Sequence, residues 1–228
     1  MAQDLLFKLV IFIGPLILAI TVHEFSHVAM ARFLGDDLGS RLGRFTLDPL
    51  KHIDPVWTIG LPALLIVMST LSGSMGIPFF AAGKPAPYNP LALKRTFFGK
   101  RISIRQGEML VAAAGPLSNL FLAFLSMIIA MILVKYGQDD MSSYSVGKLL
   151  MQFVYLNVAL FIFNLIPIPP LDGSKVLLAC LPNKAAQRFE AVGAQLSWVL
   201  LAFIIFGGGT IISYVVQWVV RAMLSLFI

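Results

Sequence analysis

Five residues near the start of the chain, His23-Glu24-Phe25-Ser26-His27, combine side chains that can bind a metal ion with one that can accept a proton. In a helix, residues four positions apart share one face, so the imidazoles of His23 and His27 can bind the same ion. Glu24 lies about 100° around the helix from His23, which places it to act on water and not on the metal.

This motif follows a long apolar run, Leu5 to Val22, and therefore lies within a predicted helix that is long enough to cross a bilayer. The pattern H-E-x-x-H is typical of zinc metalloproteases, but it also occurs by chance in soluble helices. Within hydrocarbon, two histidines and a glutamate are costly unless they are paired or bind a metal. The apolar setting therefore favours a metal site over a chance match.

The composition of the chain excludes a soluble globular enzyme. Hydrophobic residues make up 58% of the 228 residues and charged residues 12%, whereas soluble domains have roughly 25% charged residues. We expect an all-α polytopic membrane protein whose residues 1–228 form a single integral membrane domain. The net charge of +6 does not indicate a nucleic-acid partner, because the basic residues lie in short loops where they contact the head groups of the lipid bilayer.

The apolar runs predict about five to six transmembrane helices, with one re-entrant element and short β-strands at the membrane surface. The runs are Leu5 to Leu34, Val56 to Ala82, Met109 to Val134, Leu149 to Ile166, Ala191 to Phe206 and Thr210 to Ile228. The last two are either two spans or one span and a surface-lying helix. Arg41 to Asp48 predicts a surface strand, and Lys84 to Asn89 an extended segment. We interpret the small residues between 114 and 119 as a helix-packing surface.

A zinc ion bound by two histidines needs a third protein ligand and an open position for water. Since the chain has three histidines and one cysteine, the remaining candidates are His52, Cys180 and the carboxylates. Asp172 is the candidate at membrane depth, because it follows a span that ends at three prolines, and irregular backbone there is tolerated where it lines a polar cavity. The alternative for Asp172 is a helix-end or interfacial carboxylate. We expect His52 to be a solvated or capping residue outside the metal site.

Three motifs together are similar to those of the site-2 protease family, the intramembrane zinc metalloproteases. They are His23-Glu24-x-x-His27, Gly115-Pro116-x-x-Asn119 and Asn164-x-x-Pro167-x-Pro169-x-Leu171-Asp172-Gly173. Their order and their location in apolar spans also match, and the chain resembles most the compact branch without a PDZ domain. The resemblance implies that His23, His27 and Asp172 bind one Zn²⁺ ion, that Glu24 is the general base, and that Asn164 faces the substrate or its oxyanion.

The shared metal constrains the topology, because all three ligands must lie at one depth. The span that carries the histidines and the span before Asp172 must then run in the same direction. This requires Val56 to Ala82, which Pro62, Pro78 and several glycines interrupt, to enter and leave the membrane on one side. Most Lys and Arg residues then lie on the face of the site, which predicts an active site towards the cytoplasm.

We therefore expect an intramembrane zinc metalloendopeptidase of the cell membrane. It would hydrolyse a peptide bond in or near a transmembrane segment of membrane-protein substrates, in regulated intramembrane proteolysis. An edge strand, Arg41 to Leu47 or Lys84 to Asn89, could hold the substrate extended. The alternatives are a metal-ion or proton transporter and a non-catalytic protein that binds membrane segments. The ionisable residues cluster at one depth, which disfavours a transport path, and both Glu24 and Asp172 are present.

Overall fold

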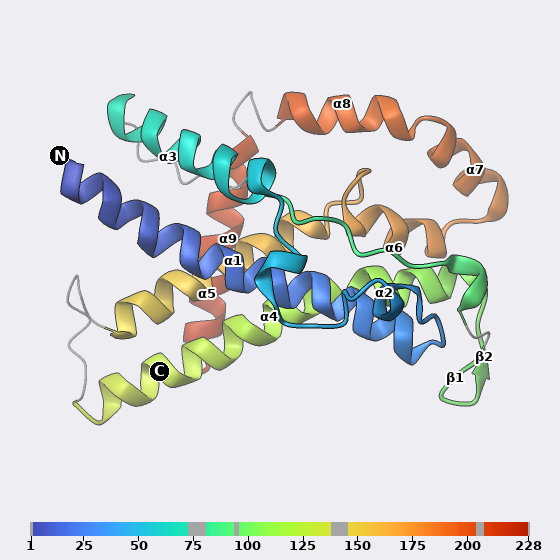
Figure 1. The fold of residues 1–228 in the computed structure, drawn as a ribbon, viewed down its shortest axis with the longest axis horizontal. Helices are drawn as coiled ribbons and strands as arrows, with labels where there is room; N and C mark the ends of the chain where they lie inside the picture. Colours follow the sequence, from blue (N-terminus) through green and yellow to red (C-terminus); the bar gives the residue numbers. More distant parts are fainter. Residues whose placement is uncertain (1, 73–80, 94–95, 138–145, 204–207, 228) are drawn as a thin grey trace.

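The structure is a computed structural model that describes residues 2–72, 81–93, 96–137, 146–203 and 208–227 (Figure 1). This part of the chain is mostly helical, as predicted. The helices are α1 (Ala2–Phe33), α2 (Leu38–Arg41), α3 (Leu61–Ser72), α4 (Ile104–Lys135), α5 (Val146–Asn164), α6 (Asp172–Cys180), α7 (Asn183–Ala191), α8 (Gly193–Phe203) and α9 (Gly209–Leu224). Shorter helical turns are η1 (Pro49–Lys51), η2 (Pro55–Gly60) and η3 (Pro90–Ala92).

Three of the described helices are long and apolar enough to cross a membrane, namely Leu9–Phe33 within α1, α4 and α5. The bounds of these helices agree with those of three predicted spans to within about five residues. Two further apolar helices, Pro55–Met68 and Gly209–Leu224, are shorter. The total of five to six spans therefore stays a prediction, as does the choice between two spans and a surface-lying helix for α8 and α9.

Helix α4 lies at the centre of the fold, where it packs against α1, α5 and α6. It begins at a capping box, in which Ser103 Oγ accepts the Gln106 N–H and Gln106 Oε1 accepts the Ser103 N–H. Figure 1 shows that α1 and α5 run in the same direction and α4 in the opposite one. This is the arrangement that a metal shared between α1 and the end of α5 requires.

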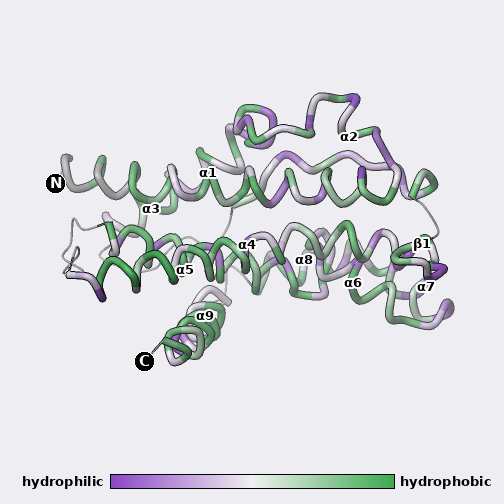
Figure 2. Tube along the Cα trace, turned by 90° about the horizontal axis from the view of Figure 1, so that it is seen from below, coloured by the Kyte–Doolittle hydropathy of each residue, from purple (hydrophilic) through white to green (hydrophobic). Residues whose placement is uncertain are grey.

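The largest apolar core lies between α4, α5 and α9, and α9 crosses α5 at a steep angle (Figures 1 and 2). Its members include Ala123, Met127, Val154, Val158, Ile212 and Val216. Figure 2 also shows that hydrophilic residues gather around α2, β1 and α7. The bundle thus has an apolar body with a polar end beside the loops that follow α1.

Prolines and a glycine shape the turn that leads from α5 to α6. Pro167, Pro169 and Pro170 cannot continue a helix, and α6 begins two residues after the last of them, at Asp172. A Cβ at Gly173 would clash with the Leu165 carbonyl, so glycine lets α6 start against the end of α5. This turn returns Asp172 to the bundle.

The prediction of a strand from Arg41 to Asp48 is wrong. The segment begins with the end of α2, where Arg41 pairs with Asp37 one turn earlier (2.6 Å). Gly43, with φ +70°, then ends the helix in a Schellman motif, since the Arg44 N–H donates to the Gly39 carbonyl. The described strands are instead β1 (Thr96–Phe97) and β2 (Lys100–Arg101), an antiparallel pair just before α4.

The ends of the segment 54–82 lie side by side. Ile53 and Gly83 form an antiparallel bridge, and the Lys84 N–H donates to the His52 carbonyl (2.7 Å). The chain thus returns at Gly83 to the place that it left at Ile53, as a re-entrant element would. Because residues 73–80 lie outside the described part, the re-entrant path itself stays a prediction.

Single cysteines at the two ends of α4 test whether this helix crosses the membrane. Arg101 and Tyr136 are both exposed and flank the helix. In a Cys180→Ser background, we expect Arg101→Cys and Tyr136→Cys to react with an impermeant maleimide from opposite sides of a sealed vesicle. Labelling of both from the same side would contradict the topology.

Candidate metal centre

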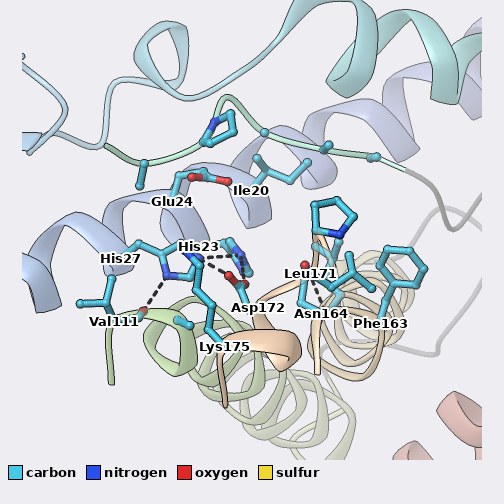
Figure 3. Close-up of a pocket in the computed structure, with 18 of the residues that line it drawn as sticks. Ile20, His23, Glu24, His27, Val111, Phe163, Asn164, Leu171, Asp172 and Lys175 are labelled. Carbon is cyan, nitrogen blue, oxygen red and sulfur yellow. Dashed lines mark hydrogen bonds and ion pairs between the residues drawn. The ribbon is translucent and has the colours of Figure 1, made fainter. Parts of the chain in front are cut away.

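Three predicted ligands converge at the contact between α1, α4 and α6 (Figure 3). The His23 and His27 Nε2 atoms are 3.1 Å apart. Asp172 Oδ2 lies 3.2 Å from the first of these atoms and 3.3 Å from the second. Both imidazoles are buried, so the three donor atoms form a compact triangle inside the protein.

The dimensions of this triangle fit a zinc ion. Zinc binds histidine nitrogen and carboxylate oxygen at roughly 2.0–2.2 Å with tetrahedral geometry, which separates neighbouring ligand atoms by about 3.3–3.5 Å. The observed separations of 3.1–3.3 Å approach this value closely. Two imidazoles and one carboxylate are also the ligand set of catalytic zinc sites, which leave a fourth position open.

The other ring nitrogen of each histidine is bonded to a carbonyl oxygen on α4. His27 Nδ1 lies 2.7 Å from the backbone oxygen of Val111, and His23 Nδ1 lies 2.6 Å from Asn119 Oδ1. Since carbonyl oxygens only accept hydrogen bonds, both Nδ1 atoms carry the proton. Each Nε2 therefore presents a lone pair towards the centre of the triangle.

Gly115 lies where α4 passes closest to the metal ligands. A Cβ at this position would clash with His27 Nε2 and lie 2.7 Å from His23 Cε1. The interpretation of residues 114–119 as a packing surface was therefore incomplete, because this stretch makes room for the imidazoles and supplies Asn119. The spacing Gly-x-x-x-Asn, one helical turn, is the signal in the sequence for this second role.

A cavity of about 400 Å³ adjoins the ligands. One wall is the extended segment after residue 81, and the other comes from α5 and the start of α6. Glu24 lines the cavity and lies under this segment, where a Cβ on Gly83 would be 2.8 Å from Glu24 Oε1. Asn164 also lines the cavity, and its Nδ2 donates to Leu160 O (3.0 Å), which leaves its second amide N–H for another acceptor.

His52 lies outside the ligand group, but it is not solvated as predicted. Its side chain is 0% exposed, and its Nε2–H donates to the Thr46 carbonyl (2.7 Å). Arg44, also buried, donates through Nη2 to the Lys84 and Pro85 carbonyls. Arg44 and the His52 backbone carbonyl, which accepts the Lys84 N–H, thus fasten the extended segment above Glu24. Sequence reasoning placed His52 by the polarity of its neighbours and missed this burial.

Sequence reasoning also missed a cluster that fastens the other end of the extended segment. Lys175 Nζ donates to Tyr88 Oη (2.8 Å), and the Tyr88 hydroxyl donates to Glu108 Oε1 (3.3 Å). Burial, and next the charge of Glu108, raises the pKa of Tyr88 above its ordinary value. These residues come from three separate segments, so no local pattern in the sequence joins them.

Comparisons with known proteins identify similar zinc metalloproteases. Residues 131–207 match peptidase family M50. The chain is 36% identical over 169 residues to "Putative zinc metalloprotease YwhC" of Bacillus subtilis, covering 73% of this chain and 67% of the relative. It is 28% identical over 197 residues to "Putative zinc metalloprotease Rip2" of Mycolicibacterium smegmatis, covering 86% and 66%.

A further relative named "Putative zinc metalloprotease Rip2", from Mycobacterium tuberculosis (strain H37Rv), is 30% identical over 192 residues, which cover 84% of this chain and 65% of the relative. The chain thus spans about two thirds of the length of these relatives. No solved structure matches the chain significantly.

Substitution of Gly115 by alanine is expected to weaken zinc binding at least about 10-fold, because the new methyl group displaces both imidazoles. Gly107→Ala is the matched control on the same helix, since its Cβ would meet only the flexible end of Leu93 at 3.1 Å. Zinc affinity is measured by competition with a chromophoric chelator. Equal losses in the two variants would contradict this account of Gly115.

The burial of His52 predicts a pH-dependent stability. Burial, with a smaller contribution from Arg44, lowers the pKa of His52, while its bond to Thr46 and the charges of Glu24 and Asp48 oppose the change. Folded His52 therefore binds fewer protons than unfolded His52, and the free energy of unfolding falls as the pH drops through about 6.5.

Thermal unfolding in detergent between pH 8 and pH 5 measures this dependence. We expect His52→Gln, which cannot titrate but retains a donor for Thr46, to lose less stability on acidification than the wild type. An identical pH profile in the two proteins would rule out a contribution from His52.

Proposed function

Because this chain belongs to peptidase family M50, the site-2 proteases, we propose that it is an intramembrane zinc endopeptidase that cleaves transmembrane segments of membrane proteins. The observation that carries the proposal is the triangle of two histidines and one aspartate, 3.1–3.3 Å on its sides, with Glu24 beside it. Both histidines lie within the membrane-span candidate Leu9–Phe33. A zinc site in this position favours substrates that lie in the bilayer.

The residues of the site have distinct roles in this proposal. His23, His27 and Asp172 hold one zinc ion, which supplies a Lewis acid for the scissile carbonyl and makes water more acidic. Glu24 takes the proton from the attacking water and returns it to the leaving amine. Asn164 offers its second amide N–H to the carbonyl oxygen as negative charge develops there.

The extended segment after residue 81 supports a substrate held in β-conformation. The Ala82 and Lys84 N–H groups donate to the preceding loop, at Trp57 and His52. Since backbone groups alternate along a strand, those of Gly83 face the other way, towards the substrate in this proposal. Of the two predicted edge strands, Arg41 to Leu47 is helical and turned, so the segment that includes Lys84 to Asn89 is the one that can pair with a substrate.

We also propose that the protein resides in the cell membrane with its site towards the cytoplasm. Most of the basic residues lie in three places, which are the loops that follow α1, the loop before α4, and α7. These elements form the polar end of the bundle (Figure 2). This end lies beside the metal ligands on α1. The positive-inside rule places such a face in the cytoplasm.

Substitution of the general base separates catalysis from metal binding. Glu24→Gln is expected to retain stoichiometric zinc, since the three ligands are unchanged, and to lower the cleavage rate by about 10²–10⁴-fold. Zinc content is measured by mass spectrometry, and cleavage with a panel of transmembrane peptides in liposomes. Zinc binding without cleavage in the wild type would favour a non-catalytic membrane-segment binder, and no zinc in either protein would refute the site.

The close approach of the extended segment to Glu24 gives a second test. Gly83→Ala is expected to lower peptide cleavage with little effect on zinc binding, because its methyl group would lie 2.8 Å from both Glu24 Oε1 and Ile20 Cγ2. Gly14→Ala, whose Cβ has no neighbour within 4 Å, is the control. Loss of zinc in Gly83→Ala would show that the segment supports the metal and not the reaction.

A further inference from the structure

Two asparagines are completely buried among the apolar helices. Asn119 on α4 and Asn157 on α5 are both 0% exposed. A buried amide costs free energy unless its hydrogen bonds are made, so each of these residues needs polar partners. The sequence motif included Asn119, whereas Asn157 belongs to none of the motifs that we identified.

The two amides form a chain of hydrogen bonds that leads to the metal centre. Asn157 Nδ2 donates to the Phe153 carbonyl (2.9 Å), and Asn157 Oδ1 accepts from Asn119 Nδ2 (2.9 Å). Asn119 Oδ1 then accepts from His23 Nδ1 (2.6 Å). The chain thus runs from a backbone carbonyl of α5, across α4, to a ligand on α1.

Chemistry fixes the direction of every bond in this chain. The Phe153 carbonyl can only accept, so the NH₂ group of Asn157 faces it and the oxygen faces Asn119. The NH₂ group of Asn119 must then point to this oxygen and to the Ala19 carbonyl (3.3 Å), which leaves its own oxygen for His23. Because the Asn119 oxygen can only accept, His23 Nδ1 must carry the ring proton. The lone pair of the neutral ring is then on Nε2.

The two histidine ligands are therefore held in different ways. His27 Nδ1 donates directly to the Val111 backbone carbonyl, which a helix fixes regardless of side chains. The partner of His23 is a side-chain amide whose two ends could exchange places by rotation. Its orientation depends on what surrounds it, and Asn157 supplies the shorter of the two bonds that hold its NH₂ end.

We propose that Asn157 is a positioning residue for the metal centre, which orients the Asn119 amide and thereby keeps His23 in the tautomer that binds metal through Nε2. This inference rests on the proposed function only in that the centre binds zinc. The competing interpretation is that Asn157 merely joins α4 to α5, as buried amides do in membrane helices. The two interpretations differ in what they predict for His23.

The test uses two variants that break the chain, Asn157→Leu, which keeps the branched shape of the side chain, and Asn157→Ala, which removes it. We expect each to weaken zinc binding by about 10- to 100-fold, as loss of an outer-shell partner does. Asn157→Asp is the conservative variant, since a neutral carboxylic acid in this apolar setting can donate to Phe153 and accept from Asn119. It should bind zinc within a few-fold of the wild type. Thr21→Val, which removes a buried hydroxyl bonded to its own helix at Ile17, is the control.

A second readout is independent of both zinc and activity. The chain has three histidines, so the ¹⁵N spectrum of histidine-labelled apoprotein has few ring signals. We expect wild-type His23 to be protonated at Nδ1, and Asn157→Leu and Asn157→Ala to shift His23 towards mixed tautomers, with His27 and His52 unchanged.

Unfolding temperatures complete the test. A lower unfolding temperature with wild-type zinc affinity and an unchanged His23 spectrum would overturn the proposal and leave only a packing role. A wild-type protein that binds no zinc would refute the proposed function, whereas the tautomer of His23 in the apoprotein would still decide the role of Asn157.

Discussion

The close contact between α4 and α1 at Gly115 is the constraint on which the rest of the structure depends. Polar groups inside an apolar bundle are tolerated only when each has a partner, and the Nδ1 partners of both histidine ligands come from α4. Its backbone holds His27, its Asn119 holds His23, and its flank supports α6, which carries Asp172. A wider separation of the two helices would break both imidazole bonds, because the histidines lie on neighbouring turns of α1 and both acceptors lie on α4.

The metal ligands could be predicted from the sequence because their signals are local. The i, i+4 spacing of His23 and His27 and the prolines before Asp172 each depend on a few neighbouring residues, and the three long spans follow from their apolar length. The partners of the ligands could not be predicted, because Asn157 and the Tyr88–Lys175–Glu108 cluster depend on contacts between distant segments. The strand that we expected from residue 41 does not form, and the reason is local. The Asp37–Arg41 ion pair and Gly43 favour a helical turn, which the alternation of polar and apolar residues in this segment does not reveal.

The site has two parts that are supported differently. The metal ligands are carried by packed helices, and the wall that faces Glu24 is an extended segment held by loops. The ligands are carried by helices packed along their length, whereas Glu24 faces an extended segment fastened at one end by Arg44 and the backbone of His52, and at the other by Tyr88. Several of the residues that fasten this segment are buried or half-buried although they are charged or titratable. Their burial is consistent with a segment that must keep a set position above Glu24 while its outer edge remains free for pairing.

The unequal support of the two histidines has a consequence for how such a site can change over generations. No substitution on α4 removes the carbonyl at Val111, so the acceptor for His27 Nδ1 does not depend on which side chain stands at that position. The orientation of the His23 ring depends on two side chains, Asn119 on α4 and Asn157 on α5. A mutation at either position can change the affinity for the metal without replacing a ligand. During evolution, the metal affinity of this site should therefore change more readily by substitution of Asn157 on α5 than by substitution of the histidines themselves.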